Sequence, residues 1–115
     1  MFINKIYSLR YCMNYKTIGR CSYMFHNNKC YINNLHVERL YRNKNVGSNI
    51  LNDIEKKCIN NNINIIELVA KQNSLSDLNQ FYFKNNYKLI KNDPEIFTSY
   101  NDDVLYLYRF RKNLS

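Results

Sequence analysis

Glycine, proline and tryptophan are scarce in this chain of 115 residues, which contains two Gly, one Pro and no Trp. The hydrophobic residues nevertheless make up 45% of the chain and the aromatic residues 15%. A chain of this composition can bury surface, so collagen-like and wholly disordered proteins are excluded. The length predicts a single domain over residues 1–115 with one hydrophobic core.

Closely spaced cysteines and long apolar runs are also absent. The four cysteines, Cys12, Cys21, Cys30 and Cys58, lie 9, 9 and 28 positions apart. Because a zinc site usually includes a closely spaced pair, we expect reduced, mostly buried thiols and no metal. No segment approaches the roughly 20 apolar residues of a membrane span, and basic residues interrupt the N-terminal stretch. We therefore expect a soluble, cytoplasmic protein with no membrane partner.

Asparagine is abundant, with 21 residues, and 11 residues are Tyr. Asn, Lys, Ile and Tyr all have A/T-rich codons, so their surplus is typical of an A/T-rich genome. Asn is also the residue other than Gly that best tolerates a positive φ. We therefore expect Asn at some positions where a less biased chain would carry Gly.

The hydrophobic pattern predicts a mixed α/β structure with the order β-β-β-α-β-α-β-β. Strands are expected at 2–13 and 17–25, followed by a turn at Asn27-Asn28 and an alternating strand at 30–37. An amphipathic helix follows, and its apolar positions are Val46, Ile50, Leu51, Ile54 and Cys58. A buried strand is predicted at 63–70, followed by a helix that is capped by Ser74 or Ser76 and runs to about 85. The last elements are a strand at 87–91, a loop that begins at Asp93-Pro94, and a strand at 104–110.

The segment from Leu35 to Ser48 passes from a strand directly into a helix N-terminus. Its loop holds Arg42 and Lys44 together with residues that tolerate left-handed conformations. Unpaired backbone N–H groups and the positive end of the helix dipole would favour a pyrophosphate there, and Gly47 would allow its close approach. An ordinary strand-to-helix turn with solvated basic residues is the alternative.

This segment resembles the signature of the GNAT superfamily of acyl-CoA-dependent N-acyltransferases. In that family a strand reading L-x-V is followed by R/Q-x-x-G-x-G/A, often as R-G-K-G-I-G-S. Here the matching residues are Leu35-x-Val37 and then Arg42, Asn43, Lys44, Asn45, Val46, Gly47 and Ser48. Asn43 and Asn45 occupy two Gly positions, as composition leads us to expect, and the side chain of Asn45 stands where a phosphate would approach.

A second block is similar to the family pattern N-x-x-A-x-x-x-Y-x-K-x-G-F. Residues 81–87 read Phe-Tyr-Phe-Lys-Asn-Asn-Tyr, so Tyr82 matches the family tyrosine and Asn86 lies in the Gly position. Asn73 lies nine residues before Tyr82, where seven is usual. The resemblance covers about residues 16–110 and implies a mostly antiparallel sheet with two main helices, in a minimal member that lacks the N-terminal strand and helices of the family.

The resemblance implies acetyl-CoA as co-substrate and direct transfer of its acetyl group to a primary amine. The backbone of Leu35, His36 and Val37 would line the pantetheine arm, with an N–H near Val37 polarising the thioester carbonyl. The N–H groups from Asn43 to Ser48, with Asn73, would complete coenzyme binding. Tyr82 would protonate the departing thiolate, although a Tyr at an apolar helical position is commonly a core residue.

No general base can be carried over from the family. Glu67 and His36 are the main candidates, with Glu38 and Tyr31 also near the expected site. Glu67 could equally be a salt-bridged strand residue, and the His36 side chain should point away from the face shared by Leu35 and Val37.

Two other functions compete with an acetyltransferase. The chain could be a GNAT-like binding or interaction module that has lost catalysis, since two Gly positions hold Asn. The net charge of +8 and the many tyrosines also permit a nucleic-acid-binding domain, but the basic residues are spread along the chain. The acceptor, a small molecule or a protein, stays open, and a homodimer is a possible assembly.

Overall fold

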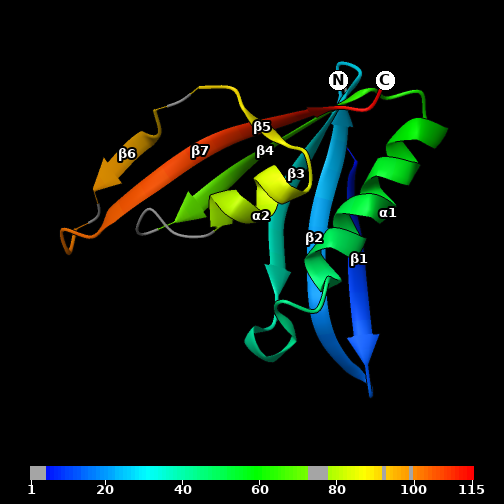
Figure 1. Ribbon diagram of the computed structural model, residues 1–115, viewed down its shortest axis with the longest axis horizontal. Coiled ribbons are helices and arrows are strands. Elements are labelled where there is room, and N and C mark those ends of the chain that lie inside the picture. The colour runs from blue at the N-terminus through cyan, green and yellow to red at the C-terminus, as the bar shows by residue number, and fades with distance from the viewer. Residues whose placement is uncertain (1–4, 73–77, 92, 99) are drawn as a thin grey trace. The chain divides into compact units, whose positions relative to one another are not determined.

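The computed structural model describes residues 5–72, 78–91, 93–98 and 100–115 and shows a mixed α/β fold (Figure 1). It contains a seven-stranded, mostly antiparallel sheet and two α-helices, which confirms the predicted fold class. In chain order the elements are β1 (Ile6–Met13), β2 (Lys16–His26), β3 (Lys29–Val37), the 3-10 helix η1 (Arg39–Tyr41), α1 (Val46–Asn60), β4 (Ile65–Gln72), α2 (Leu78–Lys84), β5 (Lys88–Leu89), β6 (Glu95–Thr98) and β7 (Val104–Asn113).

The chain forms two compact units, residues 1–66 with 113–115 and residues 67–112. In the first unit, β1, β2 and β3 are antiparallel neighbours joined by two-residue turns. Asn14 and Tyr15 form one turn and Asn27 and Asn28 the other, and all four have positive φ between 50° and 64°. Two positive φ values in a two-residue loop are typical of the hairpin turn that matches strand twist. The predicted turn at Asn27-Asn28 is confirmed.

An irregularity in β3 decides which of its side chains face α1. Asn34 has φ 55°, and the register with β2 shifts so that Ser22 lies opposite Asn33 whereas Arg20 lies opposite His36. One extra residue in β3 is a β-bulge, which moves the following side chains to the other face. Ile32, opposite Tyr23, and Val37, opposite Gly19, therefore share one face although their spacing is odd.

Helix α1 packs its predicted apolar side against this sheet (Figure 1). Ile50, Leu51, Ile54 and Cys58 are fully buried, as the helical spacing predicts. The helix approaches β2 at Gly19, where an added Cβ would stand 2.9 Å from Val46 Cγ1 and 3.0 Å from Ile50 Cδ1. Further along, the hydroxyl of Tyr11 on β1 donates to the Asp53 carboxylate, and it also lies 3.1 Å from the Asn49 carbonyl. Gly19 thus lets the start of α1 sit directly on the sheet.

In the second unit, β7 pairs antiparallel with β5 and with β6. Its core includes Tyr82, Tyr87, Tyr108 and Phe110. Strand β6 is an addition to the predicted order, because Glu95–Thr98 falls in the expected loop. Those residues are mostly β-branched or aromatic and pair with Val104–Leu107, so a partner strand stabilises an extended conformation there.

Several predicted boundaries shift. The strand expected at 87–91 is reduced to Lys88–Leu89, and the one expected at 63–70 runs from Ile65 to Gln72. The predicted caps, Ser74 and Ser76, lie outside the described residues. Within the described ranges, no helix has the length and apolar composition to cross a membrane. Cys21, Cys30 and Cys58 are buried as expected, and Cys12 is exposed.

Candidate active site

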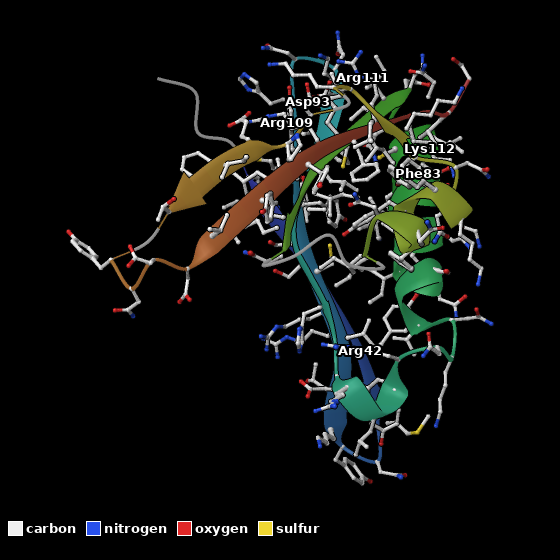
Figure 2. All side chains as sticks on the ribbon, turned by 60° about the vertical axis from the view of Figure 1, so that its left-hand side comes forward. Arg42, Phe83, Asp93, Arg109, Arg111 and Lys112 are labelled. Atoms are coloured by element: carbon white, nitrogen blue, oxygen red, sulfur yellow. The ribbon has the colours of Figure 1, made fainter. Side chains whose placement is uncertain are left out.

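The candidate site is built where β3 ends and the chain turns through η1 into α1. The N–H of Glu38 donates to the Ile18 carbonyl at 2.8 Å, which fixes the end of β3 against β2, and the N–H of Tyr41 donates back to Glu38 O at 2.8 Å. The Arg42 Nε then donates to the Val37 carbonyl at 3.0 Å. The Arg42 side chain, labelled in Figure 2, therefore folds back and joins the loop to the end of β3.

The loop itself depends on two asparagines with left-handed backbones. Asn43 has φ 63° and Asn45 has φ 64°, and these are the two positions where the R-G-K-G-I-G-S form of the family signature carries Gly. This conformation costs free energy for residues other than Gly, and the cost is smallest for Asn. Among the described residues eight Asn have positive φ and no Gly has it. The prediction that Asn replaces Gly is thus confirmed in conformation.

The first turn of α1 has features that favour a bound anion. Asn45 is the N-cap residue but its side chain makes no capping hydrogen bond, and the first turn holds no acidic side chain. The N–H groups of Val46, Gly47 and Ser48 lie in this first turn, where a helix offers no internal acceptor. Since the dipole and these N–H groups favour negative charge, the turn is suited to bind a phosphate.

Two basic side chains border this helix start. Arg42 and Lys44 are both exposed, and Lys44 Nζ lies 5.7 Å from the centre of the Tyr41 ring. With Nε bonded to Val37, the terminal nitrogens of Arg42 remain to contact an anion. The loop, the helix start and the two cations together form what we call the anion cradle, residues 42–48.

The strand residues next to the anion cradle are half-buried. Leu35, His36 and Val37 follow the bulge at Asn34, and bulges often re-aim side chains beside active sites. Because His36 lies opposite Arg20, its side chain is on the face away from Val37, as predicted. His36 Nε2 lies 3.4 Å from the Glu38 carboxylate, and both side chains are about two-fifths exposed, at 41% and 42%. His36 is thus accessible to a ligand on that face.

Glu67 belongs to the second unit and is ion-paired. Its Oε1 accepts from Nε of Arg111 at 3.0 Å and from Nη2 at 2.5 Å, and its side chain is 17% exposed. Arg111 lies on β7 (Figure 2). The salt-bridged alternative considered for Glu67 is therefore what the structure shows, and a role as base stays a prediction.

Tyr82 lies on α2, also in the second unit, and is 5% exposed. Its ring centre is 5.1 Å from that of Phe110 and 6.1 Å from that of Tyr87. Asn86, in the Gly position of the second block, has φ 70° and ends the helix in a left-handed conformation. The second block is thus confirmed in local structure, whereas the proton-donor role of Tyr82 stays a prediction. Asn73 lies outside the described residues.

Two residues that position the site are not predicted by the sequence pattern. Gly19 lies under the start of α1, and its being one of only two glycines was a usable signal. Asn34 creates the bulge before Leu35, and its signal was the same Asn-for-Gly rule that found Asn43 and Asn45. In the described residues no group of three or more His, Cys, Asp or Glu could hold a metal ion.

A strand that leads through a short loop into an uncapped helix N-terminus is an arrangement suited to the phosphates of a nucleotide-type cofactor. A profile described as the acetyltransferase (GNAT) domain matches residues 4–98. The chain therefore belongs to the GNAT acetyltransferase family. Among curated proteins, no significant match is found.

Solved structures support the same fold. An aminoglycoside 6'-N-acetyltransferase complexed with coenzyme A superposes with a TM-score of 0.74 at 15% identity, over 96% of this chain and 73% of the other. An acetyltransferase from Bacillus cereus gives 0.76 at 20% identity, over 96% and 74%. The PaiA N-acetyltransferase from Thermoplasma acidophilum, in complex with coenzyme A, gives 0.68 at 20%, over 94% and 60%. At these identities the likeness establishes the fold alone.

Proposed function

We propose that this protein is an N-acetyltransferase that transfers the acetyl group of acetyl-CoA to a primary amine by direct attack in a ternary complex. The observation that carries the proposal is the left-handed conformation of Asn43 and Asn45. Codon bias alone would scatter Asn without regard to conformation. Asn instead adopts the Gly-like conformation at both Gly positions of the coenzyme-binding motif.

The anion cradle would bind the pyrophosphate of acetyl-CoA. Backbone N–H groups from Asn43 to Ser48 would donate to its oxygens, and Arg42 and Lys44 would supply positive charge. The Asn45 side chain would crowd the phosphate, because the common motif leaves that position without a Cβ. This crowding predicts binding that is weaker than a Gly at position 45 would allow.

The strand end would hold the reacting carbonyl. A backbone N–H near Val37 would stabilise negative charge on the carbonyl oxygen as the amine nitrogen attacks the carbonyl carbon. The carbon–sulfur bond then breaks, and the phenol of Tyr82 would give its proton to the thiolate. The amine must lose a proton to His36, to Glu67 or to water. Because Glu67 is engaged by Arg111, His36 is the better of the two side chains.

Acetyl-CoA binding tests this proposal. We expect a rise in melting temperature with acetyl-CoA, since a ligand at about 100 times its Kd stabilises the folded state by about 2.7 kcal/mol. Asn45→Gly should tighten the Kd for acetyl-CoA in calorimetry. Asn86→Gly is the matched control, because it relieves the same left-handed strain at φ 70° outside the anion cradle. An unchanged melting temperature at millimolar acetyl-CoA would contradict the proposal.

Turnover tests the chemistry separately. Tyr82→Phe should keep the Kd for acetyl-CoA and lower kcat by about 100-fold, the usual contribution of a general acid. Tyr87→Phe is the control, because it removes the same hydroxyl from a neighbouring buried ring. Saturable acetyl-CoA binding without turnover of any amine would favour the second candidate, a GNAT-like binding module, which the Asn side chains at positions 43 and 45 support.

A further inference from the structure

The face of the first unit that points away from α1 carries a row of basic side chains. In the register of the sheet Arg10 on β1 lies opposite Arg20 on β2, and Arg20 lies opposite His36 on β3. The three residues therefore form one row across three adjacent strands. We call Arg10, Arg20 and His36 the basic row.

The strand alternation places this row on the face without the helix. Gly19 meets Val46 and Ile50 of α1, and Tyr11 bonds to Asp53 of the same helix. Successive residues of a strand point to opposite faces, so Arg10 and Arg20 point away from α1. Both arginines are exposed and can meet a ligand.

The two arginines form an unfavourable pair by themselves. Residues directly opposite in an antiparallel pair have Cβ atoms about 5 Å apart, and like charges at this distance repel. Within residues 5–72 neither Arg10 nor Arg20 has an ion-pair partner, whereas His36 has Glu38. A carboxylate or phosphate between the two guanidinium groups would remove the repulsion and accept paired hydrogen bonds from each.

The basic row also lies beside the strand end proposed to hold the thioester. His36 is flanked by Leu35 and Val37, and neighbouring strands are about 4.8 Å apart. Arg20 is therefore one strand from His36 and Arg10 is two strands away. Register shifts next to the row, between Tyr11 and Cys12 and between Arg20 and Ser22, shape this end of the sheet. If the anionic group of a small molecule were bound by the two arginines, an amine about two to four bonds away in the same molecule would lie beside His36.

We propose that the acetyl acceptor is an amine that also carries an anionic group, a carboxylate or a phosphate, and that Arg10 and Arg20 bind this group. The inference rests on the proposed function and adds the substrate class. It explains why two neighbouring arginines without an ion-pair partner in residues 5–72 lie beside the strand end proposed to hold the thioester. It also predicts discrimination against polyamines, since a second ammonium group would meet the arginines.

Matched amines test the inference. Initial rates with acetyl-CoA should be measured for O-phosphoethanolamine against ethanolamine, for β-alanine against β-alaninamide, and for the polyamine spermidine. We expect kcat/KM to be about tenfold or more higher for the charged member of at least one pair, and the two pairs distinguish phosphate from carboxylate. Equal or higher kcat/KM for the neutral member in both pairs, or for spermidine relative to both anionic amines, would overturn the inference.

Variants of the row separate recognition from folding. Arg20→Ala and Arg10→Ala should raise KM for the anionic amine by about tenfold or more and leave KM for its neutral partner and the Kd for acetyl-CoA unchanged. Lys56→Ala, which removes one exposed positive charge from α1, should change none of these values. An equal effect of Arg20→Ala on both amines would refute specific recognition.

The outcomes distinguish this inference from the proposed function. If acetyl-CoA binds but no anionic amine is acetylated, the inference is wrong and the coenzyme site stands. If acetyl-CoA does not bind, the proposed function fails. Calorimetry with O-phosphoethanolamine then decides whether the basic row binds an anion, with the Arg10→Ala/Arg20→Ala protein expected to lose that binding and equal binding counting against the row.

Discussion

Replacing Gly19 by Ala tests the packing that holds the start of α1 against the sheet. The new Cβ would lie 2.9 Å from Val46 Cγ1 and 3.0 Å from Ile50 Cδ1, closer than the roughly 3.5–4.0 Å of a normal carbon contact. Val46 cannot turn away easily, because a β-branched side chain in a helix has one strongly preferred rotamer. The start of α1 must therefore move outward by about half an ångström.

The energetic cost follows from two opposing effects. Overpacking a dense core by one methyl group costs about 1–3 kcal/mol. The lower entropy of the unfolded chain with Ala returns about 0.4–1 kcal/mol. The net loss in the free energy of unfolding should be about 1–2 kcal/mol, or roughly 5–10 °C in melting temperature for a chain of this size. Because α1 begins at the anion cradle, acetyl-CoA binding should weaken as well.

Urea denaturation of three variants checks this reasoning. Gly19→Ala and Val46→Ala should each lower the free energy of unfolding. The double variant should lose less than the sum, since removing Cγ1 makes room for the new Cβ. A Gly19→Ala protein as stable as the wild type, or strictly additive losses, would show that the contact at Gly19 is not tight.

Three further predictions concern the first unit. Tyr11→Phe should lose about 1–2 kcal/mol of stability in urea denaturation, because its hydroxyl donates to the Asp53 carboxylate, whereas Tyr15→Phe at the exposed hairpin tip should lose nothing. Burial raises the pKa of Cys21 from 9.0 to about 12, so between these pH values the thiol ionises only in the unfolded chain. The contribution of Cys21 to the free energy of unfolding is fully present below pH 9 and should be lost as the pH rises towards 12. Denaturation series at several pH values should therefore show a shallower fall for Cys21→Ala than for the wild type. Iodoacetamide at pH 8 should label the native protein once, at the exposed Cys12, and mass spectrometry should find four labels after denaturation; labelling of Cys21 in the native protein would contradict its burial.

The features that the sequence predicts well are those with a local cause. The hairpin turn at Asn27-Asn28 and the loop at Asn43 and Asn45 follow from a conformational preference of Asn itself. The apolar face of α1 follows from the spacing of Ile50, Leu51 and neighbouring residues, because a helix brings such positions together whatever surrounds it. The family resemblance depends on the same local signals.

The features that the sequence missed or left open depend on pairing between separate segments. Strand β6 forms because Glu95–Thr98 pairs with Val104–Leu107, and the choice between a base and a salt-bridged residue at Glu67 depends on Arg111, 44 positions later. No pattern within one of these segments contains its partner. The same holds for the basic row, whose members become neighbours only through the register of three strands.

The sequence by itself therefore determined the Asn turns and the left-handed loop, since backbone preference is a property of single residues, and the motif around that loop carried the family resemblance. Tertiary structure alone decided what surrounds those turns: the close approach of α1 to Gly19, the face that His36 occupies after the bulge, and the meeting of Arg10 with Arg20. These depend on strand register and packing distance, which arise only when separate segments of the chain come together.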